Sequence, residues 1–505
     1  MNTRNIIRLN FIIVLFLITF RGVANTNVLD IVYTSPKNNS ILHLPQTQIL
    51  IKNKTPLNLD SFINKFKINL LGNQLHNYEY DLRISNDQKT IIIDPKKEFE
   101  LGEQVIFQIQ ENREERIVLN LEFTITPKTS VSPKNQINPI IAKASRFPNY
   151  SITINNNPWN TNLFFHISSP PNSSVNILDT NGQLSFSKNM SAKGMDWKVN
   201  LDNNLTYSDR NGGWFVMNNY HNEIDSIYCK NGYVADMHDF MALPNGNYVL
   251  IAYDLQPYAM DTVVTGGDPN AEVEGLIIQE LDSNQNLIYQ WRSWDYFHIT
   301  DNVHLSLTSN FLPFIHGNAI DIDFDGHFLI SSKGLDEITK IDRNSGDIIW
   351  RWGGSKNEYT FINDYPFSGQ HCIRSLGSNR YILYDNGNYS NQYTGTPKRS
   401  RGVEYILDTI MMTVEKTWEF VRPDTVFAAS TGSIQRLPNS NTLINWGNIK
   451  RINNFTYSGG AIITEIDTNN QIVFEIEFAN GENAYRAHKF DWFFDSSIVG
   501  CANNT

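Results

Sequence analysis

Three histidines occupy equivalent places in a recurring segment of this sequence. His238 begins HDFMALPNGNYVLIAY, His316 begins HGNAIDIDFDGHFLISS, and His371 lies in QHCIRSLGSNRYILYD. Each segment has the pattern of a strand, an Asn/Asp/Gly turn and a second strand. A neutral imidazole can act as a nucleophile and as a proton carrier near neutral pH. If the segments are structural repeats, the sequence predicts one convergent site of three histidines suited to group transfer.

A fourth copy of the segment, GSIQRLPNSNTLINWG from residue 432, lacks the histidine. It has Thr431 and Ser433 at that place, which would offer hydroxyl donors. Three histidines could also hold a metal ion, as in open catalytic zinc sites. The sequence shows no carboxylate partner for such a site and no CxxC motif, so we expect no metal and no cofactor.

A second repeat positions these segments. It consists of an aspartate, a turn and an apolar or aromatic strand, and it recurs with a spacing of about 46 to 66 residues at Asp179, Asp225, Asp282, Asp342, Asp408 and Asp467. Repeats of this length built from short strands are typical of β-propeller blades. We therefore expect an all-β fold with a six-bladed β-propeller over residues 148–495, in which equivalent strand starts converge on a central channel. The alternative is an all-β sandwich.

The residues before the propeller divide into three parts. Residues 1–24 carry Arg4 and Arg8, a short apolar run and small residues, the pattern of a signal peptide, so we expect export to the periplasm or the medium. Residues 27–127 alternate in short runs such as TQILIKN and predict a small Ig-like β-sandwich. Residues 128–147 predict a linker. No apolar stretch is long enough to span a membrane.

DIDFDG, at residues 321–326, matches the start of a calcium-binding loop. That loop needs a glutamate at its twelfth position, which here is Ser332. The equivalent turns in the other copies, PNGN and PNSN, lack the acids. The stretch therefore predicts a hairpin turn rather than a calcium site.

Composition and charge limit the partners. The 505 residues are 41% hydrophobic and carry a formal net charge of −11, which argues for a globular protein and against nucleic-acid binding. Cys229, Cys372 and Cys501 allow at most one disulfide. A homodimer is left open.

Over about residues 200–480 the chain resembles the bacterial aryl-sulfate sulfotransferases that use no nucleotide donor. The resemblance rests on four stretches in order, which are MHDF at 237–240, HGNAIDID at 316–323, QHCIR at 370–374 and SRGVEYILD at 400–408. It implies a small aryl sulfate donor, a phenolic acceptor and a propeller preceded by a β-sandwich. It also implies that His371 becomes transiently sulfated.

The same resemblance implies roles for other residues. His238 and His316 would be catalytic neighbours of His371, and Asn318 would donate to a sulfate oxygen. Lys333 stands where the family has an arginine and supplies charge without a bidentate fork. Arg401 and Thr431 match family positions and are expected at the substrate.

Competing functions have weaker signals. The sequence contains no Gly-rich phosphate-binding loop, no sulfatase Cys-x-Pro-x-Arg signature and no GxSxG elbow. IDRNSGDIIWRWGG resembles the tryptophan repeat of quinoprotein propellers, but the equivalent positions elsewhere are mixed aromatics that favour packing between blades. A secreted, non-catalytic propeller that binds a partner or a glycan stays open as the alternative function.

Overall fold

The computed structural model describes residues 29–73, 77–129, 147–169, 172–190, 195–208, 212–394 and 397–492. The predicted signal peptide, Cys501 and residues 130–146 of the predicted linker lie outside these ranges. The all-β fold class is confirmed, since regular structure in the described ranges is mostly strand. The helical elements are short: α1 (Leu59–Lys65), α2 (Ser390–Thr394), η2 (Met260–Thr262), η3 (Ser293–Asp295), η4 (Ile299–Asp301) and η5 (Lys333–Leu335). No helix among the described residues is long and apolar enough to cross a bilayer.

The N-terminal part consists of two four-stranded sheets around one apolar core. The predicted run at residues 104–111 buries alternate residues, as period-2 patterning requires. The runs at 49–53 and 90–95 are buried on both faces, because Leu50 and Ile92 pack against a second core. One sheet contains β1 (Ile31–Ser35), β3 (Ile49–Asn53), β6 (Thr90–Pro95) and β5 (Tyr80–Ile84). The other contains β2 (Ser40–His43), β8 (Ile117–Ile125), β7 (Gln104–Glu111) and β4 (Phe66–Leu71).

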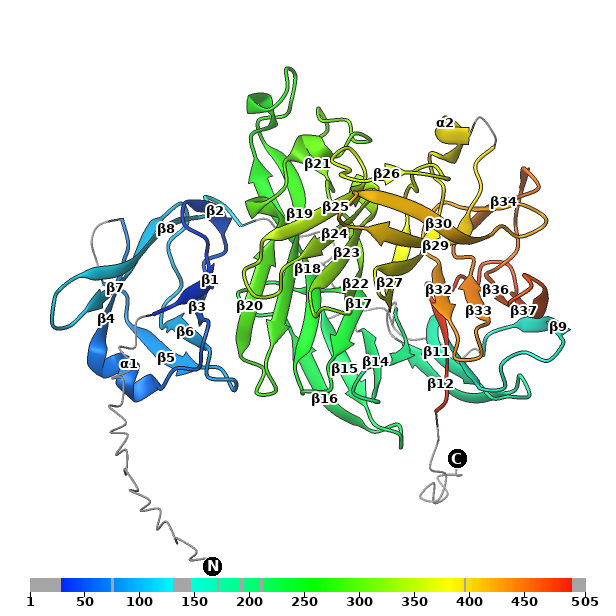
Figure 1. Ribbon diagram of the computed structural model, residues 1–505, viewed down its shortest axis with the longest axis horizontal. Helices are drawn as coiled ribbons and strands as arrows, with labels where there is room; N and C mark the ends of the chain where they lie inside the picture. Colours follow the sequence, from blue (N-terminus) through cyan, green and yellow to red (C-terminus); the bar gives the residue numbers. More distant parts are fainter. Residues whose placement is uncertain are drawn as a thin grey trace, which may run out of the picture.

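The rest of the described chain folds mainly into sheets of four or five strands that follow one another along the sequence (Figure 1). The first sheet contains β10 (Asn162–Ser169), β11 (Asn172–Leu178), β12 (Leu184–Met190) and β38 (Ala487–Phe490), and the second contains β13 (Lys198–Val199), β14 (Leu205–Ser208), β15 (Gly213–Met217) and β16 (Glu223–Tyr228). The third contains β17 (Ala235–Ala242), β18 (Tyr248–Tyr258), β19 (Ala271–Leu281), β20 (Leu287–Arg292) and β21 (Phe311–Leu312), and the fourth contains β22 (Gly317–Ile322), β23 (Phe328–Ser332), β24 (Glu337–Ile341) and β25 (Ile348–Gly353). The fifth contains β26 (Thr360–Phe361), β27 (His371–Gly377), β28 (Arg380–Asp385), β29 (Arg401–Asp408) and β30 (Thr413–Phe420), and the sixth contains β32 (Ser433–Arg436), β33 (Thr442–Asn445), β36 (Ile462–Ile466), β37 (Ile472–Phe478) and β9 (Tyr150–Asn155). A smaller sheet contains β31 (Val426–Ala428), β34 (Ile449–Ile452) and β35 (Phe455–Thr456).

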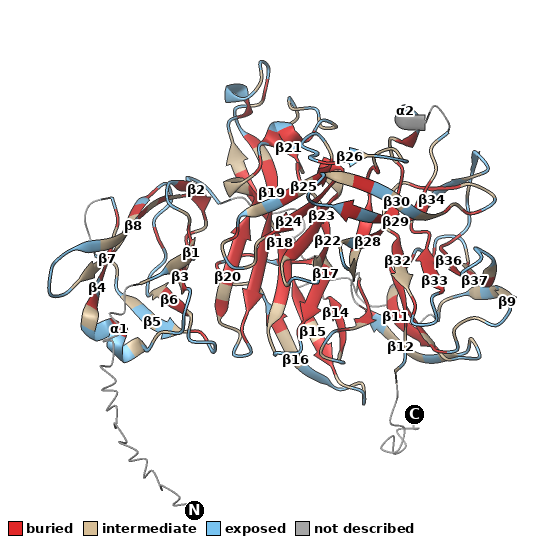
Figure 2. Cartoon of the chain, in the orientation of Figure 1, coloured by how far each residue is buried: buried red, intermediate tan, exposed pale blue. Residues whose placement is uncertain are grey.

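The first strands of these sheets contact one another in turn. β17 contacts β22, β22 contacts β27, β27 contacts β32, β32 contacts β38, and β38 contacts β13. β38 comes from the C-terminal end of the described chain yet pairs with β10, and β9 pairs with β37 at the other end of the sequence. Distant segments therefore join the first and last sheets, which protects strand edges that would otherwise stay unpaired. Most residues in the middle of these strands are buried (Figure 2).

The stretch DIDFDG forms the predicted hairpin turn. β22 and β23 pair antiparallel with Ile322 opposite Phe328, and the turn lies between them. Carboxylate oxygens of Asp323 and Asp325 each lie 2.6 Å from Nζ of Lys340. The two acids therefore neutralise a lysine of the neighbouring strand β24.

The N-terminal sheets are fixed to the rest of the molecule through β20, beside which Figure 1 shows them. The buried guanidinium of Arg292 donates to the carbonyls of Ile41 at 3.0 Å and Leu42 at 2.7 Å. The hydroxyl of Tyr33 donates to the carbonyl of Gln290 at 2.5 Å and accepts its N–H at 2.8 Å. Buried polar groups must find partners, so these contacts hold the two parts in one relative position.

Candidate functional site

His371 begins β27 and is almost completely buried. Its Nδ1 lies 2.6 Å from Oδ1 of Asn386 and 3.0 Å from the carbonyl oxygen of Gly369. The Asn386 amide is oriented by its NH₂ group, which donates to the carbonyls of Ala428 and Thr431. Nδ1 therefore faces two acceptors and carries the proton, which leaves the lone pair on Nε2. Only the N–H of Thr431, at 3.2 Å, is placed against that lone pair among the described residues.

The surroundings of His371 keep it neutral. Burial holds the pKa of His371 well below its ordinary value, and the positive charge of Lys333 lowers it further, with smaller effects from His238 and Arg486. Hydrogen bonding to Asn386 opposes this shift. A buried neutral imidazole surrounded by cations is suited to attack an anionic group, because it needs no deprotonation and its neighbours attract negative charge.

His238 and His316 lie together, with ring centroids 5.2 Å apart. His238, within β17, interacts through Nδ1 with a carboxylate oxygen of Asp236. A carboxylate in this position fixes the orientation of the ring and leaves the other nitrogen to exchange protons. His316 comes directly before β22. Strands β17 and β22 thus bring two of the three histidines together.

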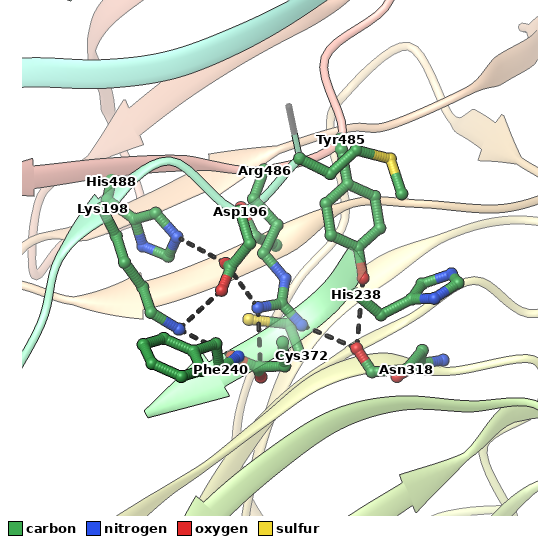
Figure 3. A network of polar contacts seen from close by, with 12 residues as sticks. Asp196, Lys198, His238, Phe240, Asn318, Cys372, Tyr485, Arg486 and His488 are labelled. Carbon is green, nitrogen blue, oxygen red and sulfur yellow. Dashed lines mark hydrogen bonds and ion pairs between the residues drawn. The ribbon is translucent and has the colours of Figure 1, made fainter. Parts of the chain in front are cut away.

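The side chain of Asn318, which was predicted to donate a hydrogen bond to a sulfate oxygen, already has a protein partner. It is fully buried, and its NH₂ group donates to the carbonyl of Gln370 at 2.7 Å. Its backbone carbonyl accepts from the Tyr485 hydroxyl at 3.1 Å and from Arg486 at 2.8 Å (Figure 3). Asn318 therefore links β22 to the residues directly before β27 and β38, and this geometry favours positioning over substrate binding.

Arg486 is a buried cation that the sequence reasoning missed. One of its nitrogens lies 2.7 Å from Asp196 and 3.1 Å from Asp239, as part of the network in Figure 3. Lys198 lies 2.6 Å from both carboxylates. A buried charge is stable only when it is paired with an opposite charge. This cluster therefore links β13, β17 and the residue directly before β38, which are the first strands of three sheets.

Lys333 lies in η5, directly after β23, and its backbone N–H donates to the carbonyl of His316. Burial lowers the pKa of its ammonium, and the charge of Asp336 opposes this effect. No ion pair or hydrogen bond joins its Nζ to another residue in the described ranges. With His316 it lines a pocket of about 240 Å³. Lys333 thus offers a positive charge to an anionic group in the pocket, and its predicted part in substrate binding stays a prediction.

Thr431 contacts the site through its backbone. Its φ is 59°, and His316 and Cys372 have φ values of 44° and 58°. Left-handed conformations cost free energy for residues other than glycine, most of all for a β-branched one, and they concentrate at functional sites. The strained turns at these strand starts aim the N–H of Thr431 at His371.

Arg401 belongs to a separate cluster. It is fully buried, and its guanidinium contacts Asp385 at 2.9 Å, Asp364 at 3.0 Å and Glu419 at 3.2 Å. Asp385 accepts backbone N–H groups of Ser368 and Gly387, which flank the His371 turn. The geometry favours a structural role for Arg401, and its predicted part in substrate binding stays a prediction.

Sequence reasoning also missed Asn386, Asp236 and Tyr485. Asp236 stands two residues before His238, and an acidic residue so close to a candidate catalytic histidine was a usable signal. Asn386 directly follows the second strand of the QHCIR segment, and only the pairing of β27 with β28 brings it to His371. Cys229 and Cys372 are both free thiols. Among the described residues, no three His, Cys, Asp or Glu side chains are arranged to hold a metal ion.

Comparisons with known proteins identify a family whose model matches most of the chain. The family model for Arylsulfotransferase (ASST) matches residues 140–486. No curated protein matches the chain. Similar solved structures include a protein of unknown function from Bacteroides caccae, at 12% identity over 65% of this chain and 98% of that chain with a TM-score of 0.40. A streptogramin B lyase is 11% identical over 68% of this chain and 98% of that chain, with a TM-score of 0.35. These remote similarities carry no argument about function.

The family match spans more than half of the sequence and includes all three histidines, Asn318, Lys333, Arg401 and Thr431. It covers the strands from β9 to β37 in full and ends directly before β38. The chain therefore belongs to the arylsulfotransferase (ASST) family, which makes it a sulfotransferase with a small-molecule donor and acceptor.

Proposed function

We propose that this protein moves a sulfuryl group from an aryl sulfate ester to a phenol in two steps, through a sulfated His371. The observation that carries the proposal is the fixed tautomer of His371. Asn386 and Gly369 hold the Nδ1 proton, so the reactive lone pair is on Nε2. Lys333 and His316 line a pocket whose wall includes Gly369, two residues before His371.

In the first step Nε2 of His371 attacks the sulfur of the donor. The N–S bond forms as the bond from sulfur to the aryl oxygen breaks, and the electron pair leaves with the phenolate oxygen. The reaction resembles phosphoryl transfer, in which positioned charges stabilise the equatorial oxygens. Lys333, which lines the pocket, is the cation placed to do this. The N–H of Thr431 donates to Nε2 itself, so it leaves that lone pair as the N–S bond forms.

Proton transfer is assigned to the pair His238 and His316. His316 lines the pocket, and Asp236 supports His238 behind it. One imidazolium donates its proton to the leaving phenolate and later takes the proton of the acceptor phenol. In the second step the acceptor oxygen attacks sulfur, the N–S bond breaks, and the electron pair returns to Nε2.

The proposed fold around this chemistry is a six-bladed propeller over residues 148–495, preceded by an Ig-like sandwich at 27–127. The succession of contacting first strands supports the propeller, and the two N-terminal sheets around one core support the sandwich. We further propose export of the protein, on the basis of the signal-peptide pattern at 1–24.

The direct test is transfer from 4-nitrophenyl sulfate to phenol by the purified protein. His371→Ala should abolish transfer, while the matched change His298→Ala, at an exposed histidine, should leave it unchanged. After a rapid quench with donor alone, mass spectrometry should find a sulfuryl group on the His371 peptide. If a range of aryl donors and phenols gave no turnover, the proposal would be refuted. The non-catalytic binding function would then be the remaining alternative.

A further inference from the structure

The pocket beside Lys333 and His316 has one aromatic wall. The ring of His304 stacks on that of Tyr389, with centroids 3.8 Å apart and planes 7° from parallel. Leu305 completes this side. At about 240 Å³ the pocket is smaller than the sites that hold drug-sized ligands, which suits a substrate of one or two rings.

His304 is held rigidly at this wall. Its Nε2 lies 2.6 Å from Oδ2 of Asp336, and its backbone N–H donates to Oδ1 of Asn302 at 2.9 Å. The Asn302 amide in turn donates to the carbonyl of Phe314 at 2.8 Å. A ring fixed in this way loses little conformational freedom when a ligand stacks beside it.

Asp336 also contacts the turn that holds the proposed nucleophile His371. It is 3% exposed, and its second carboxylate oxygen accepts the N–H of Gly369 at 2.6 Å. The carbonyl of Gly369 lies 3.0 Å from Nδ1 of His371. Gly369 has a φ of 62°, and a Cβ there would lie 2.6 Å from Oδ1 of Asn388, so the turn requires glycine. One carboxylate thus connects His304 with the turn that orients His371.

We propose that His304 and Tyr389 form an aromatic platform that binds the aryl group of the substrate, and that Asp336 is a positioning residue that couples the platform to His371. The inference rests on the proposed transferase function for the identity of the ligand. Aromatic rings prefer offset or edge contacts with one another, so a planar substrate gains contact that a saturated ring of the same size does not. Lys333, on the same pocket, then meets the sulfate end of that substrate.

Binding in the inactive His371→Ala protein tests the platform without chemistry. The probe is 4-methylumbelliferone, followed by its fluorescence. His304→Leu should weaken binding about 10-fold, His304→Phe should restore it to within about 3-fold, and His298→Leu should leave it unchanged. Cyclohexanol should compete far more weakly than phenol. Unchanged binding by His304→Leu, or equal competition by cyclohexanol, would overturn the platform.

Turnover in the otherwise unmodified protein tests the coupling. Asparagine suits the left-handed backbone at position 336, where φ is 53°, so Asp336→Asn should fold. We expect His304→Leu to raise KM while kcat stays within about 2-fold, and Asp336→Asn to raise KM and also lower kcat about 10-fold. An unchanged kcat for Asp336→Asn would overturn the coupling.

The two proposals fail in different ways. Loss of all aryl sulfate turnover in the parent protein, with binding that still depends on His304, would refute the transferase and support the platform. Aryl sulfate turnover together with ligand binding that does not depend on His304 would support the transferase and refute the platform.

Discussion

The side-chain oxygen of Asn386 lies 2.6 Å from Nδ1 of His371. Because the Asn386 NH₂ group is engaged by two backbone carbonyls, the oxygen cannot exchange places with the nitrogen without losing those bonds. This contact decides which nitrogen of the histidine is protonated, and therefore which one can react.

Replacing Asn386 should cost catalysis more than binding. Asn386→Leu removes the acceptor that holds the Nδ1 proton, so we expect kcat for aryl sulfate transfer to fall on the order of 100-fold with a small change in KM. Steady-state kinetics with 4-nitrophenyl sulfate measure this. Asn469→Leu, at an exposed turn between β36 and β37, is the matched control. A fall in kcat of the same size in both variants would contradict the role of Asn386.

The charge of Lys333 should matter more than its shape. Lys333→Met removes the cation that lines the pocket and lowers the pKa of His371, and we expect kcat/KM to fall roughly 100- to 1000-fold. Lys333→Arg should recover most of the loss, because a guanidinium also pairs with sulfate oxygens. If Lys333→Met retained full activity, the anion would have to bind elsewhere.

The rate should not decline on the acid side through protonation of His371. Its pKa lies well below 6.5, so the nucleophile stays neutral as pH falls through that value. Lys333→Met removes the second-largest cause of the shift, so the pKa of His371 should rise in that variant. Titration of His371 by NMR in both proteins checks this. An ordinary histidine pKa in the parent protein would contradict the buried, cation-flanked geometry.

Stability should fall as the solution becomes acidic. His488 is buried beside Lys198 and Arg486, and burial lowers its pKa from 6.5 to about 4. Between these values the unfolded chain binds a proton that the folded protein does not, so the free energy of unfolding decreases as pH falls from 6.5. The loss reaches on the order of 3 kcal/mol for His488 by pH 4. Urea unfolding from pH 7 to 4 measures it, and His488→Gln should show a shallower decline.

Arg292 should stabilise the contact between the N-terminal sheets and β20. Arg292→Met leaves the carboxylates of Asp254 and Asp295 without their cation, and we expect a loss of about 3 to 5 kcal/mol in the free energy of unfolding. Chemical unfolding followed by tryptophan fluorescence measures this. Arg83→Met removes a half-exposed ion pair within the N-terminal sheets and should cost far less. Equal losses in the two variants would contradict the buried contact.

The sequence by itself determined the strand pattern, the turn at DIDFDG and the three histidines, because period-2 alternation, Asp-Gly turns and repeats are local features. It also singled out Lys333, which lines the pocket with His316, and Thr431, whose N–H contacts His371. A sequence motif does not show that three carboxylates and a tyrosine already surround the guanidinium of Arg401.

Only the tertiary structure decided how these residues work. The proton of His371 depends on Asn386 from the neighbouring strand, and the base of the site depends on Arg486 and Asp196, which are 290 residues apart. The aromatic wall depends on His304, Tyr389 and Asp336, which come from three loops. Hydrogen bonds and ion pairs at such separations depend on strand pairing and sheet closure, which side-chain periodicity along one chain does not encode.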